Sequence, residues 1–290
     1  MKRQQSFVLV GGDIRQAYLG RMLVEKGARV TAVGLERHET GNWFPLTTDL
    51  HRACKEADVV LLPLPVMRER GLLNAPLANA PFRIAEVLDT IPPGTRVFGG
   101  SVPHMVHEMA KRRELIVRDY LAEEELALRN AIPTAEGAIQ IAMEQLPVTI
   151  HALPVLILGC GRIGTALAQR LHALGADVTV SARRYEDFAR ISAMGWHAAD
   201  TRALTGTLAR YALIINTIPA EVLSCSLVAQ CREDVLLMDL ASGTGGVTKQ
   251  ARELRPFIHA LSLPGRVAPV TAAADICETI THMLEEERKR

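Results

Sequence analysis

The sequence lacks the patterns that mark metal-binding, disulfide-bonded, nucleic-acid-binding and membrane-spanning proteins. Its five cysteines form no C-x-x-C pair and no metal-ligand spacing, so we expect reduced thiols and no metal. Lysine and arginine total 33 against 32 acidic residues, and the formal charge of +1 gives no electrostatic reason to expect a nucleic-acid or membrane partner. No apolar run reaches the roughly 18 residues that a membrane span requires.

The N-terminal residues and the composition indicate a cytoplasmic globular protein. Residues 1–6 contain no apolar segment with a cleavage site of the signal-peptide kind, and they lead directly into an apolar strand. The chain is 48% hydrophobic and 22% charged, which is typical of soluble domains. A length of 290 residues favours two domains, each with its own core.

The most informative stretch lies just past the middle of the chain. Residues 154–158 are an apolar strand that runs into Gly-x-Gly-x-x-Gly at Gly159, Gly161 and Gly164, and a helical pattern follows as far as Gly175. Strand, tight turn and helix are the context that a dinucleotide fingerprint needs. We expect Gly159 to allow the sharp turn, Gly161 to let a pyrophosphate approach the backbone, and Gly164 to bring the helix close to the strand.

The next strand bears on the choice between NAD and NADP. An NAD enzyme usually carries an acidic residue about 20 residues past the glycines, where it binds the ribose 2′-hydroxyl. This chain instead has Ser181, Ala182, Arg183 and Arg184, and arginine pairs well with phosphate. We therefore predict a 2′-phosphate pocket and NADP, with NAD as the weaker choice, while a solvated helix start remains the alternative for the two arginines. The predicted cofactor contacts are Gly159, Gly161, Arg162, Ile163, Gly164, Ser181, Ala182, Arg183, Arg184, Thr217, Ile218, Pro219 and Ala241.

The N-terminal half also begins as a strand, a turn and a helix, but its turn differs. Residues 11–16 read Gly-Gly-Asp-x-Arg-Gln, and Asp13 would repel a pyrophosphate, so we assign this half to the substrate. Ligands in doubly wound sheets bind beyond the carboxyl ends of the strands. The substrate contacts predicted by this rule are Gly12, Arg15, Gln16 and Ser101. Thr134 and Arg266, from later segments of the chain, are added to them.

These units predict an α/β fold with two Rossmann-like doubly wound parallel-sheet domains and a cleft between them. The predicted bounds are residues 1–130 for the substrate domain, 131–150 for a linking helix and 151–268 for the NADP domain. A C-terminal helix over 269–290 could pack back on the first domain. Pro133 is suited to the first position of the linking helix, which would place Thr134 and Glu136 in its first turn as capping or functional residues.

The chain resembles the family of dipicolinate synthase A subunits over essentially its whole length. Cys160 departs from the family, which more often has a larger apolar residue there. The Gly-Gly-Asp-x-Arg-Gln start and the Pro-Thr-x-Glu-Gly segment are the specific signals, since the glycine fingerprint is widespread. The motifs that carry the resemblance are residues 10–16, 130–137, 158–164, 215–219 and 263–269.

The resemblance implies a reaction and a partner. Dihydrodipicolinate, formed from the tetrahydrodipicolinate intermediate of lysine biosynthesis, would be oxidised to dipicolinate during sporulation, with NADP as hydride acceptor. The partner would be the flavoprotein-like B subunit of dipicolinate synthase in the mother-cell cytoplasm, and we also expect a homo-oligomer.

The sequence suggests residues for binding the substrate but does not identify a single catalytic base. A substrate with two carboxylates needs cationic donors, for which Arg15 is the first choice and Arg266 the second. Aromatisation releases a proton, and Glu136 and Asp13 are the candidate bases, although Asp13 could instead cap the first helix. Two alternatives remain: an NADP-binding protein without chemistry of its own, whose partner is the catalyst, and a dehydrogenase of another small carboxylic acid. Dehydrogenases of the latter kind often carry a catalytic Lys-Asp or His-Glu pair, and we find no such pair convincingly placed in this sequence, which disfavours this alternative.

Overall fold

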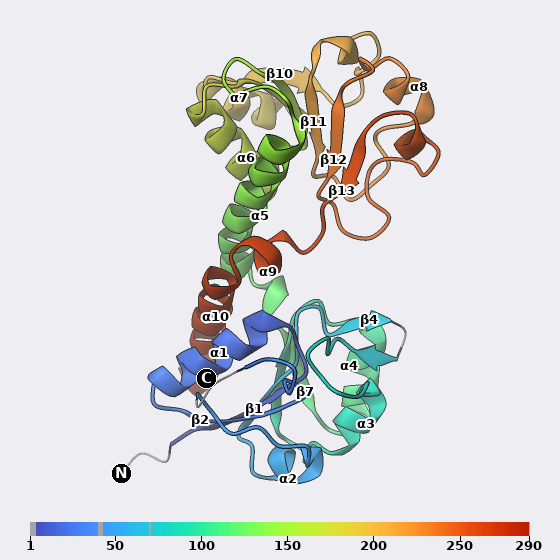
Figure 1. Ribbon diagram of the computed structural model, residues 1–290. Coiled ribbons are helices and arrows are strands. Elements are labelled where there is room, and N and C mark those ends of the chain that lie inside the picture. The colour runs from blue at the N-terminus through green and yellow to red at the C-terminus, as the bar shows by residue number, and fades with distance from the viewer. Residues whose placement is uncertain (1–3, 40–42, 70, 290) are drawn as a thin grey trace. The chain divides into compact units, whose positions relative to one another are not determined.

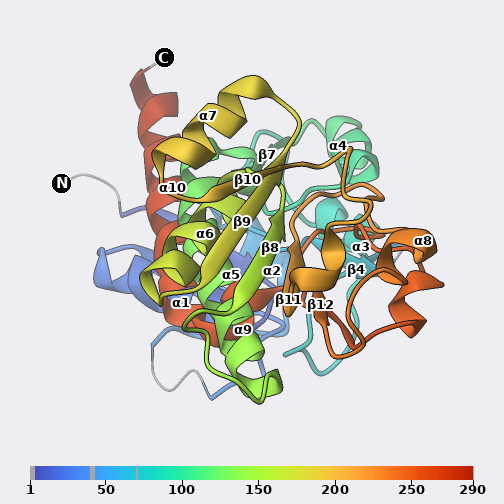
Figure 2. The same ribbon diagram turned by 90° about the horizontal axis from the view of Figure 1, so that it is seen from above.

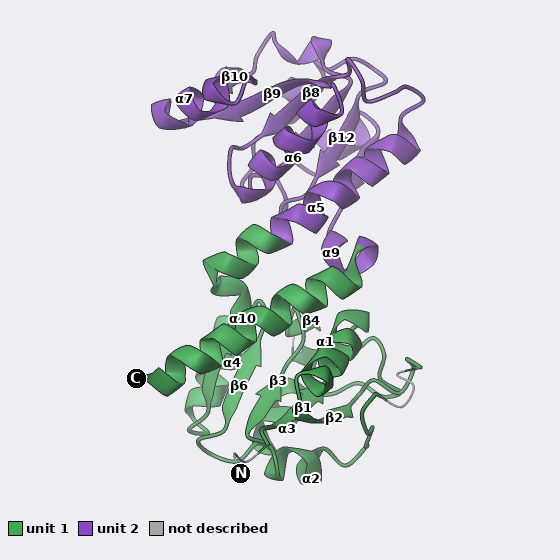
Figure 3. Ribbon diagram, turned by 90° about the vertical axis from the view of Figure 1, so that its left-hand side faces the viewer, with its two compact units in different colours: residues 1–129, 268–290 green, residues 130–267 purple. Residues whose placement is uncertain are grey.

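The computed structural model describes residues 4–39, 43–69 and 71–289 (Figure 1). The chain divides into two compact units: residues 1–129 with 268–290 form unit 1, and residues 130–267 form unit 2 (Figure 3). Both units contain a parallel sheet covered by helices, so the predicted doubly wound α/β fold is confirmed. In the described part of the chain, no helix is both long and apolar enough to cross a membrane.

Unit 1 is built on a five-stranded parallel sheet in the order β2-β1-β3-β6-β7. This is the flavodoxin-like order, in which the order of strand addition reverses at a switch point between β1 and β3. A short antiparallel hairpin, β4–β5, lies apart from this sheet. The strands are β1 (Ser6–Val10), β2 (Arg29–Val33), β3 (Val59–Leu61), β4 (Met67–Glu69), β5 (Leu72–Leu73), β6 (Arg96–Gly99) and β7 (Ile116–Asp119); the helices are α1 (Ile14–Glu25), α2 (Leu50–Lys55), α3 (Ile84–Asp89), α4 (His104–Lys111), the short 3₁₀ helix η1 (Tyr120–Ala122) and α10 (Pro269–Lys289).

Both faces of this sheet are buried, which explains the uninterrupted apolar run of β1. Successive side chains of a strand point to opposite faces. Phe7 and Leu9 pack in a cluster with residues of α1 and α10, whereas Val8 and Val10 pack in a second cluster with residues of α3 and α4. Helices α1 and α10 lie side by side on the first face (Figures 1 and 3).

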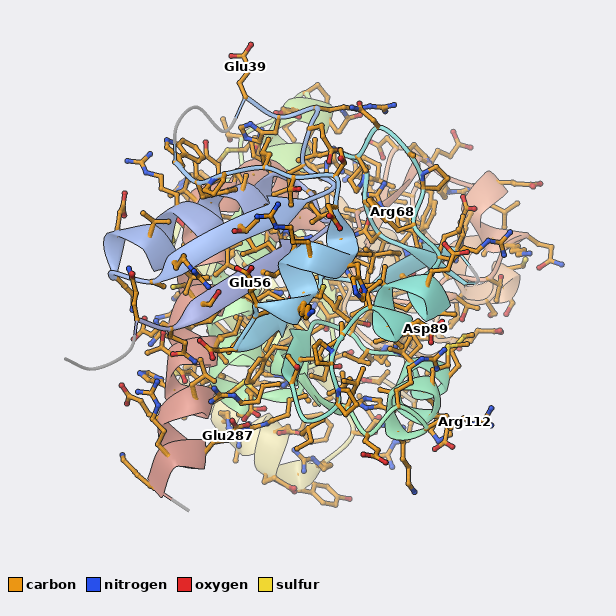
Figure 4. The ribbon with its side chains drawn as sticks, turned by 90° about the horizontal axis from the view of Figure 1, so that it is seen from below. Glu39, Glu56, Arg68, Asp89, Arg112 and Glu287 are labelled. Atoms are coloured by element: carbon orange, nitrogen blue, oxygen red, sulfur yellow. The ribbon has the colours of Figure 1, made fainter. Side chains whose placement is uncertain are left out.

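The outer surface of unit 1 carries charges of both signs. Seen from below, Glu56 and Asp89 project from the ends of α2 and α3, while Arg68 and Arg112 project from the hairpin and the end of α4 (Figure 4). All four of these residues are exposed. Exposed carboxylates and exposed guanidinium groups are therefore both present on this face.

Unit 2 has the strand order of the classic dinucleotide-binding fold. Its six parallel strands run β10-β9-β8-β11-β12-β13, which is the order 3-2-1-4-5-6 (Figures 1 and 2). The switch point, where the order in which successive strands are added to the sheet reverses, lies between β8 and β11. The strands are β8 (Pro154–Leu158), β9 (Asp177–Ala182), β10 (His197–Asp200), β11 (Leu213–Asn216), β12 (Leu236–Asp239) and β13 (Phe257–His259); the helices are α6 (Arg162–Ala173), α7 (Tyr185–Ala193), η2 (Leu208–Arg210), α8 (Cys225–Val228), η3 (Ala251–Glu253) and α9 (Leu263–Val267).

Helix α5 (Glu124–Gln145) corrects the prediction that a helix begins at Pro133. The helix is continuous through Pro133, so Thr134 and Glu136 lie in its middle and cap nothing. Pro133 has no N–H to donate to the carbonyl four residues earlier. Thr134 donates from Oγ1 to the Asn130 carbonyl oxygen at 2.7 Å instead. A buried stripe at helical spacing holds the helix across the proline: Ala131, Ala135, Ala138 and Ala142.

An ion-pair cluster within unit 1 joins the first turns of α5 to α10. Arg129 donates to Glu278 at 2.6 Å and also pairs with Glu125 at 3.0 Å. His282 Nδ1 lies 3.0 Å from a Glu125 carboxylate oxygen. This hydrogen bond, together with the nearby acidic groups, raises the pKa of His282.

The cluster predicts a pH-dependent contribution to stability. Because the folded-state pKa of His282 is raised, its contribution is fully present below about pH 6.5 and is lost as the pH rises through the folded value. We expect His282→Gln to lower the melting temperature at pH 6 and to leave it nearly unchanged at pH 9. Thermal melts across this range measure the difference, with His104→Gln, at an exposed position of α4, as the matched control. An equal loss at both pH values would contradict the assignment.

Candidate active site

The glycine turn of unit 2 has the geometry that a dinucleotide fingerprint requires. Gly159 follows β8 with φ at +103°, and a Cβ on it would lie 2.7 Å from Thr217 Oγ1. A Cβ on Gly164 would overlap the carbonyl oxygen of Gly159, because α6 passes directly against the turn. Neither position therefore accepts a larger residue without movement of the backbone.

Gly161 serves a different purpose in the same turn. It is the N-cap of α6, and no side chain caps this helix end. Apart from the adjoining residues and the backbone of α6, no heavy atom in the described part of the chain lies within 4 Å of the position that its Cβ would take. A helix N-terminus without a capping side chain favours an anion, and an open glycine lets a phosphate approach the backbone. The turn can thus hold a pyrophosphate.

The loop after β11 covers the turn from the other side of the switch point. Both the backbone nitrogen and Oγ1 of Thr217 donate to the Leu158 carbonyl oxygen, at 3.0 and 2.8 Å. Ile218 lies against Gly159, where a Cβ on the glycine would be 2.9 Å from its side chain. Residues 217–219 and the glycine turn therefore meet at the carboxyl edge of the sheet between β8 and β11, where ligands of this fold bind.

The residues predicted to bind the 2′-phosphate, at the carboxyl end of β9, differ in their exposure and in their partners. Arg184 pairs with Asp187 at 2.9 Å, which lowers the pKa of that carboxyl, and also with Glu186 at 3.3 Å. Arg183 is exposed, and no carboxylate pairs with it among the residues that the structure describes. Ser181 is fully buried, and its Oγ accepts a hydrogen bond from Thr201, so its hydroxyl supports the sheet instead of facing a ligand.

A further arginine at this edge is also held by a carboxylate. Arg202 binds Asp200 at the end of β10 at 2.8 Å, and this contact lowers the pKa of Asp200 to about 2. Among Arg183, Arg184 and Arg202, it is therefore Arg183 whose guanidinium has no carboxylate partner within the described ranges.

Sequence reasoning missed a buried polar pair at the ends of β11 and β12. Asn216 and Asp239 are both fully buried, and Asn216 Nδ2 donates to Asp239 Oδ1 at 2.8 Å. The backbone of Ala241 is fixed at the same place, since its nitrogen donates to Asp239 and its carbonyl oxygen lies 3.1 Å from His259 Nε2. The position of both residues at strand ends was the available signal, but only the strand order shows that they are neighbours.

The switch point of unit 1 gathers the first group of predicted substrate residues. Asp13 caps α1 by accepting from the Arg15 nitrogen, and it also accepts from the Arg15 guanidinium at 2.8 and 3.0 Å. The same guanidinium donates to the Leu64 carbonyl oxygen after β3. Gln16 is buried and donates to the Leu61 carbonyl oxygen at 3.0 Å. These side chains link the loop after β1 to the end of β3.

Two backbone amides at this switch point already have hydrogen-bond partners within unit 1. The Gly12 nitrogen donates to the Asn74 carbonyl oxygen at 2.8 Å, and the Gly11 nitrogen donates to Val33. Asn74 is itself 1% exposed, and neither polar atom of its side chain has a hydrogen-bond partner in the described residues. Asn74 is a second residue that sequence reasoning missed, because nothing in its local pattern predicts its place beside Gly12.

The remaining predicted residues differ in their exposure and contacts. Ser101 is exposed after β6 with φ at +54°, and its nitrogen donates to Asp119. Glu136 is half-exposed on α5 and pairs with Arg170 at 3.4 Å, in the last turn of α6 and away from the glycine turn. Arg266 is exposed on α9.

Ile163 packs on the core of unit 2, Ala182 is buried and Pro219 is exposed, while Arg162 begins α6.

The turn and the strand order of unit 2 define a nicotinamide-dinucleotide-binding protein of the doubly wound α/β class. A family model described as putative NAD(P)-binding matches residues 146–244. A second model, the N-terminal domain of the dipicolinate synthase A subunit, matches residues 6–121. The chain is thus similar to the dipicolinate synthase A subunits in its N-terminal part and to NAD(P)-binding domains in its second part.

One curated relative and two solved structures are similar to nearly the entire chain. The A subunit of dipicolinate synthase from Bacillus subtilis (strain 168) is 29% identical over 282 residues, covering 96% of this chain and 95% of the relative. The crystal structure of the A subunit from Bacillus halodurans has a TM-score of 0.89 at 29% identity, with 97% of each chain covered. The crystal structure of the Bacillus subtilis A chain has a TM-score of 0.88 at 28% identity, covering 100% of this chain and 98% of the other.

Proposed function

We propose that this chain is the dehydrogenase component of a dipicolinate synthase. Dihydrodipicolinate, derived from the tetrahydrodipicolinate intermediate of lysine biosynthesis, would lose a hydride to NADP and a proton to a base or water, which yields the aromatic pyridine. The observation that carries the proposal is the glycine turn at the switch point of unit 2, in a chain similar to the dipicolinate synthase A subunits. The cofactor would supply the redox chemistry, while the protein supplies position and electrostatic environment.

The proposal favours NADP over NAD because of Arg183. The residue sits directly after β9, where an NAD enzyme usually has an acidic side chain for the ribose 2′-hydroxyl. An exposed guanidinium without a carboxylate partner among the described residues suits a phosphate dianion. Arg184 contributes less to this proposal because Asp187 and Glu186 already engage it.

For the substrate, we propose that Asp13 orients Arg15 toward one carboxylate. Asp13 engages Nε and Nη2 of Arg15, and Leu64 accepts a second bond from Nη2. In the part of the chain that the structure describes, Nη1 makes no hydrogen bond, which leaves its two N–H donors for a ligand. Ser101 lies after β6 at the same edge of the unit 1 sheet, and we keep it as a secondary contact.

The proposal predicts a specific effect of Arg15→Lys. Lysine keeps the charge but loses the planar fork, so the variant can no longer bind Asp13 and a substrate carboxylate together. We expect the KM for the substrate to rise about tenfold or more, consistent with the loss of one charge-assisted hydrogen bond of roughly 1.5–3 kcal/mol. The dissociation constant of NADPH should not change. Arg21→Lys, at an exposed ion pair on the same helix, is the matched control. An unchanged KM in Arg15→Lys would remove Arg15 from the substrate site.

That Asp13 or Glu136 acts as the base stays a prediction. Asp13 is bound by Arg15, and Glu136 by Arg170, so each carboxylate already has a cationic partner. These contacts favour a second candidate function, an NADP-binding protein whose partner supplies the proton-accepting group. The relatives are named as the A component of their enzyme, which supports a B subunit as the partner. We further propose that this B subunit is flavoprotein-like, that this chain forms a homo-oligomer, and that both act in the mother-cell cytoplasm during sporulation.

One assay separates the two functions. The tetrahydrodipicolinate precursor and NADP are supplied to the purified chain, with and without the B subunit, and NADPH and the pyridine product are followed by absorbance. Equal appearance of both products from the chain alone supports the dehydrogenase. Appearance only when the B subunit is present supports the NADP-binding role. No NADPH in either case, with cofactor bound, would contradict dipicolinate synthesis, and a panel of small hydroxy acids would then test the remaining dehydrogenase alternative.

A further inference from the structure

In unit 2, the buried carboxylate of Asp239 holds the backbone at the carboxyl ends of β11 and β12, on one side of the switch point. Asp239 ends β12 and is fully buried. Besides the amide of Asn216, it accepts from the backbone nitrogens of Ala241 at 3.1 Å, Gly246 at 2.7 Å and Val247 at 3.3 Å. A buried carboxylate is costly unless hydrogen bonds satisfy it, and these four donors do so.

Asn216 connects this carboxylate to the neighbouring loop. Its Nδ2 donates to the Ile218 carbonyl oxygen at 3.0 Å as well as to Asp239, and its Oδ1 accepts from the Ile218 nitrogen at 3.2 Å. The loop of residues 217–219 is the one that contacts the glycine turn through Thr217. One buried pair therefore fixes both the loop after β11 and the loop of residues 240–247 after β12.

The glycines of the second loop show how closely it packs on this pair. A Cβ on Gly245 would overlap the Asp239 carboxylate, and a Cβ on Gly246 would overlap the Asn216 amide. Gly245 also has φ at +74°, in the region that favours glycine. The loop is therefore shaped around the Asp239–Asn216 pair, and its conformation depends on that pair.

We propose that Asp239, through Asn216, is a positioning residue for the nicotinamide half of the cofactor. In this fold a dinucleotide lies across the switch point, with one nucleotide on the side of β9 and β10 and the other on the side of β11 and β12. The arginines at the end of β9 assign the adenosine 2′-phosphate to the first side, so the nicotinamide nucleotide meets the two loops held by Asp239. This inference rests on the proposed function of the turn.

The test compares a whole cofactor with a probe of its adenosine half. Asp239→Asn replaces an acceptor-only group by one with two N–H donors, which would face the backbone amides and free the loops. We expect the variant to bind NADP at least about tenfold more weakly, as the loss of one buried hydrogen bond would give, and to bind adenosine 2′,5′-bisphosphate within about twofold of the unaltered chain. Calorimetric titration measures both, and Asp234→Asn, at an exposed ion pair in the same unit, is the matched control.

If Asp239→Asn does not fold, a second variant, Asn216→Asp, tests the same proposal. Asn216→Asp places two carboxylates side by side, and they must share a proton to keep their hydrogen bond. Its affinity for NADP should therefore rise as the pH falls relative to that of the unaltered chain, while its affinity for the bisphosphate follows the unaltered chain. A purely structural role would change both ligands together.

The outcomes are distinct. Weakening confined to NADP supports the positioning role. Equal weakening of both ligands, or of neither, overturns it and leaves the proposed function intact. Failure of the unaltered chain to bind either ligand would contradict the proposed function, and the inference with it.

Discussion

Gly161→Val should weaken NADP binding about 100-fold or more and should lower the stability of the protein much less than Gly164→Ala does. Apart from the adjoining residues and the backbone of α6, no heavy atom of the described chain lies within 4 Å of its Cβ position, so the fold itself leaves space for a side chain to begin here. The same side chain would occupy the space through which a pyrophosphate reaches the backbone at the start of α6. Loss of two charge-assisted hydrogen bonds at roughly 1.5–3 kcal/mol each corresponds to a dissociation constant raised about 100-fold or more.

The neighbouring glycine provides the contrast for this experiment. Gly164→Ala would drive a methyl group into the Gly159 carbonyl oxygen, so we expect a lower melting temperature together with weaker binding. Titration with NADPH and a thermal melt of each variant separate the two effects. Undiminished NADPH binding by Gly161→Val would show that the pyrophosphate does not lie on this turn.

Arg183→Ala should remove the proposed preference for NADP and leave the two cofactors bound about equally well. The guanidinium is exposed beside the end of β9 and has no carboxylate partner in the described ranges, so its removal costs the folded protein little. A 2′-phosphate would lose one or two charge-assisted hydrogen bonds, which raises the dissociation constant of NADP about 10- to 100-fold. NAD lacks this phosphate, and its affinity should stay within about twofold.

Arg184→Ala is the matched comparison. Its guanidinium is engaged by Asp187 and Glu186, so its loss should weaken NADP less than the loss of Arg183 and should destabilise the start of α7 instead. Parallel titrations of NADP and NAD on both variants and on the double variant measure the preference. Equal losses for NADP and NAD in Arg183→Ala would contradict the 2′-phosphate pocket.

The features that the sequence predicted correctly are local ones. The glycine turn is recognisable because strand, turn and helix are contiguous, and the structure shows a steric reason for Gly159 and Gly164 and open space at Gly161. The doubly wound class follows from apolar strands alternating with amphipathic helices. The order of strands in unit 1 is not a local property, and the flavodoxin-like arrangement of β1 and β3 appears only in the folded sheet.

The features that it missed depend on contacts between distant residues. Asn216 and Asp239 are 23 positions apart and become neighbours because β11 and β12 pair. Asn74 reaches Gly12 only through the fold of the segment after β3. At Pro133 the local rule was outweighed, since the alanine stripe on both sides of the proline packs as one helix. The expectation for Thr134 and Glu136 depended on that helix start.

The most direct test of the account is amide hydrogen exchange on the full chain with and without NADP. The central claim is that unit 2 holds the dinucleotide across the switch point between β8 and β11. We predict that NADP slows exchange in two segments of that edge, residues 161–165 at the start of α6 and residues 217–218 after β11, and that the effect on 161–165 disappears in Gly161→Val. Protection confined to unit 1, or unchanged exchange in both segments at saturating NADP, would contradict the claim.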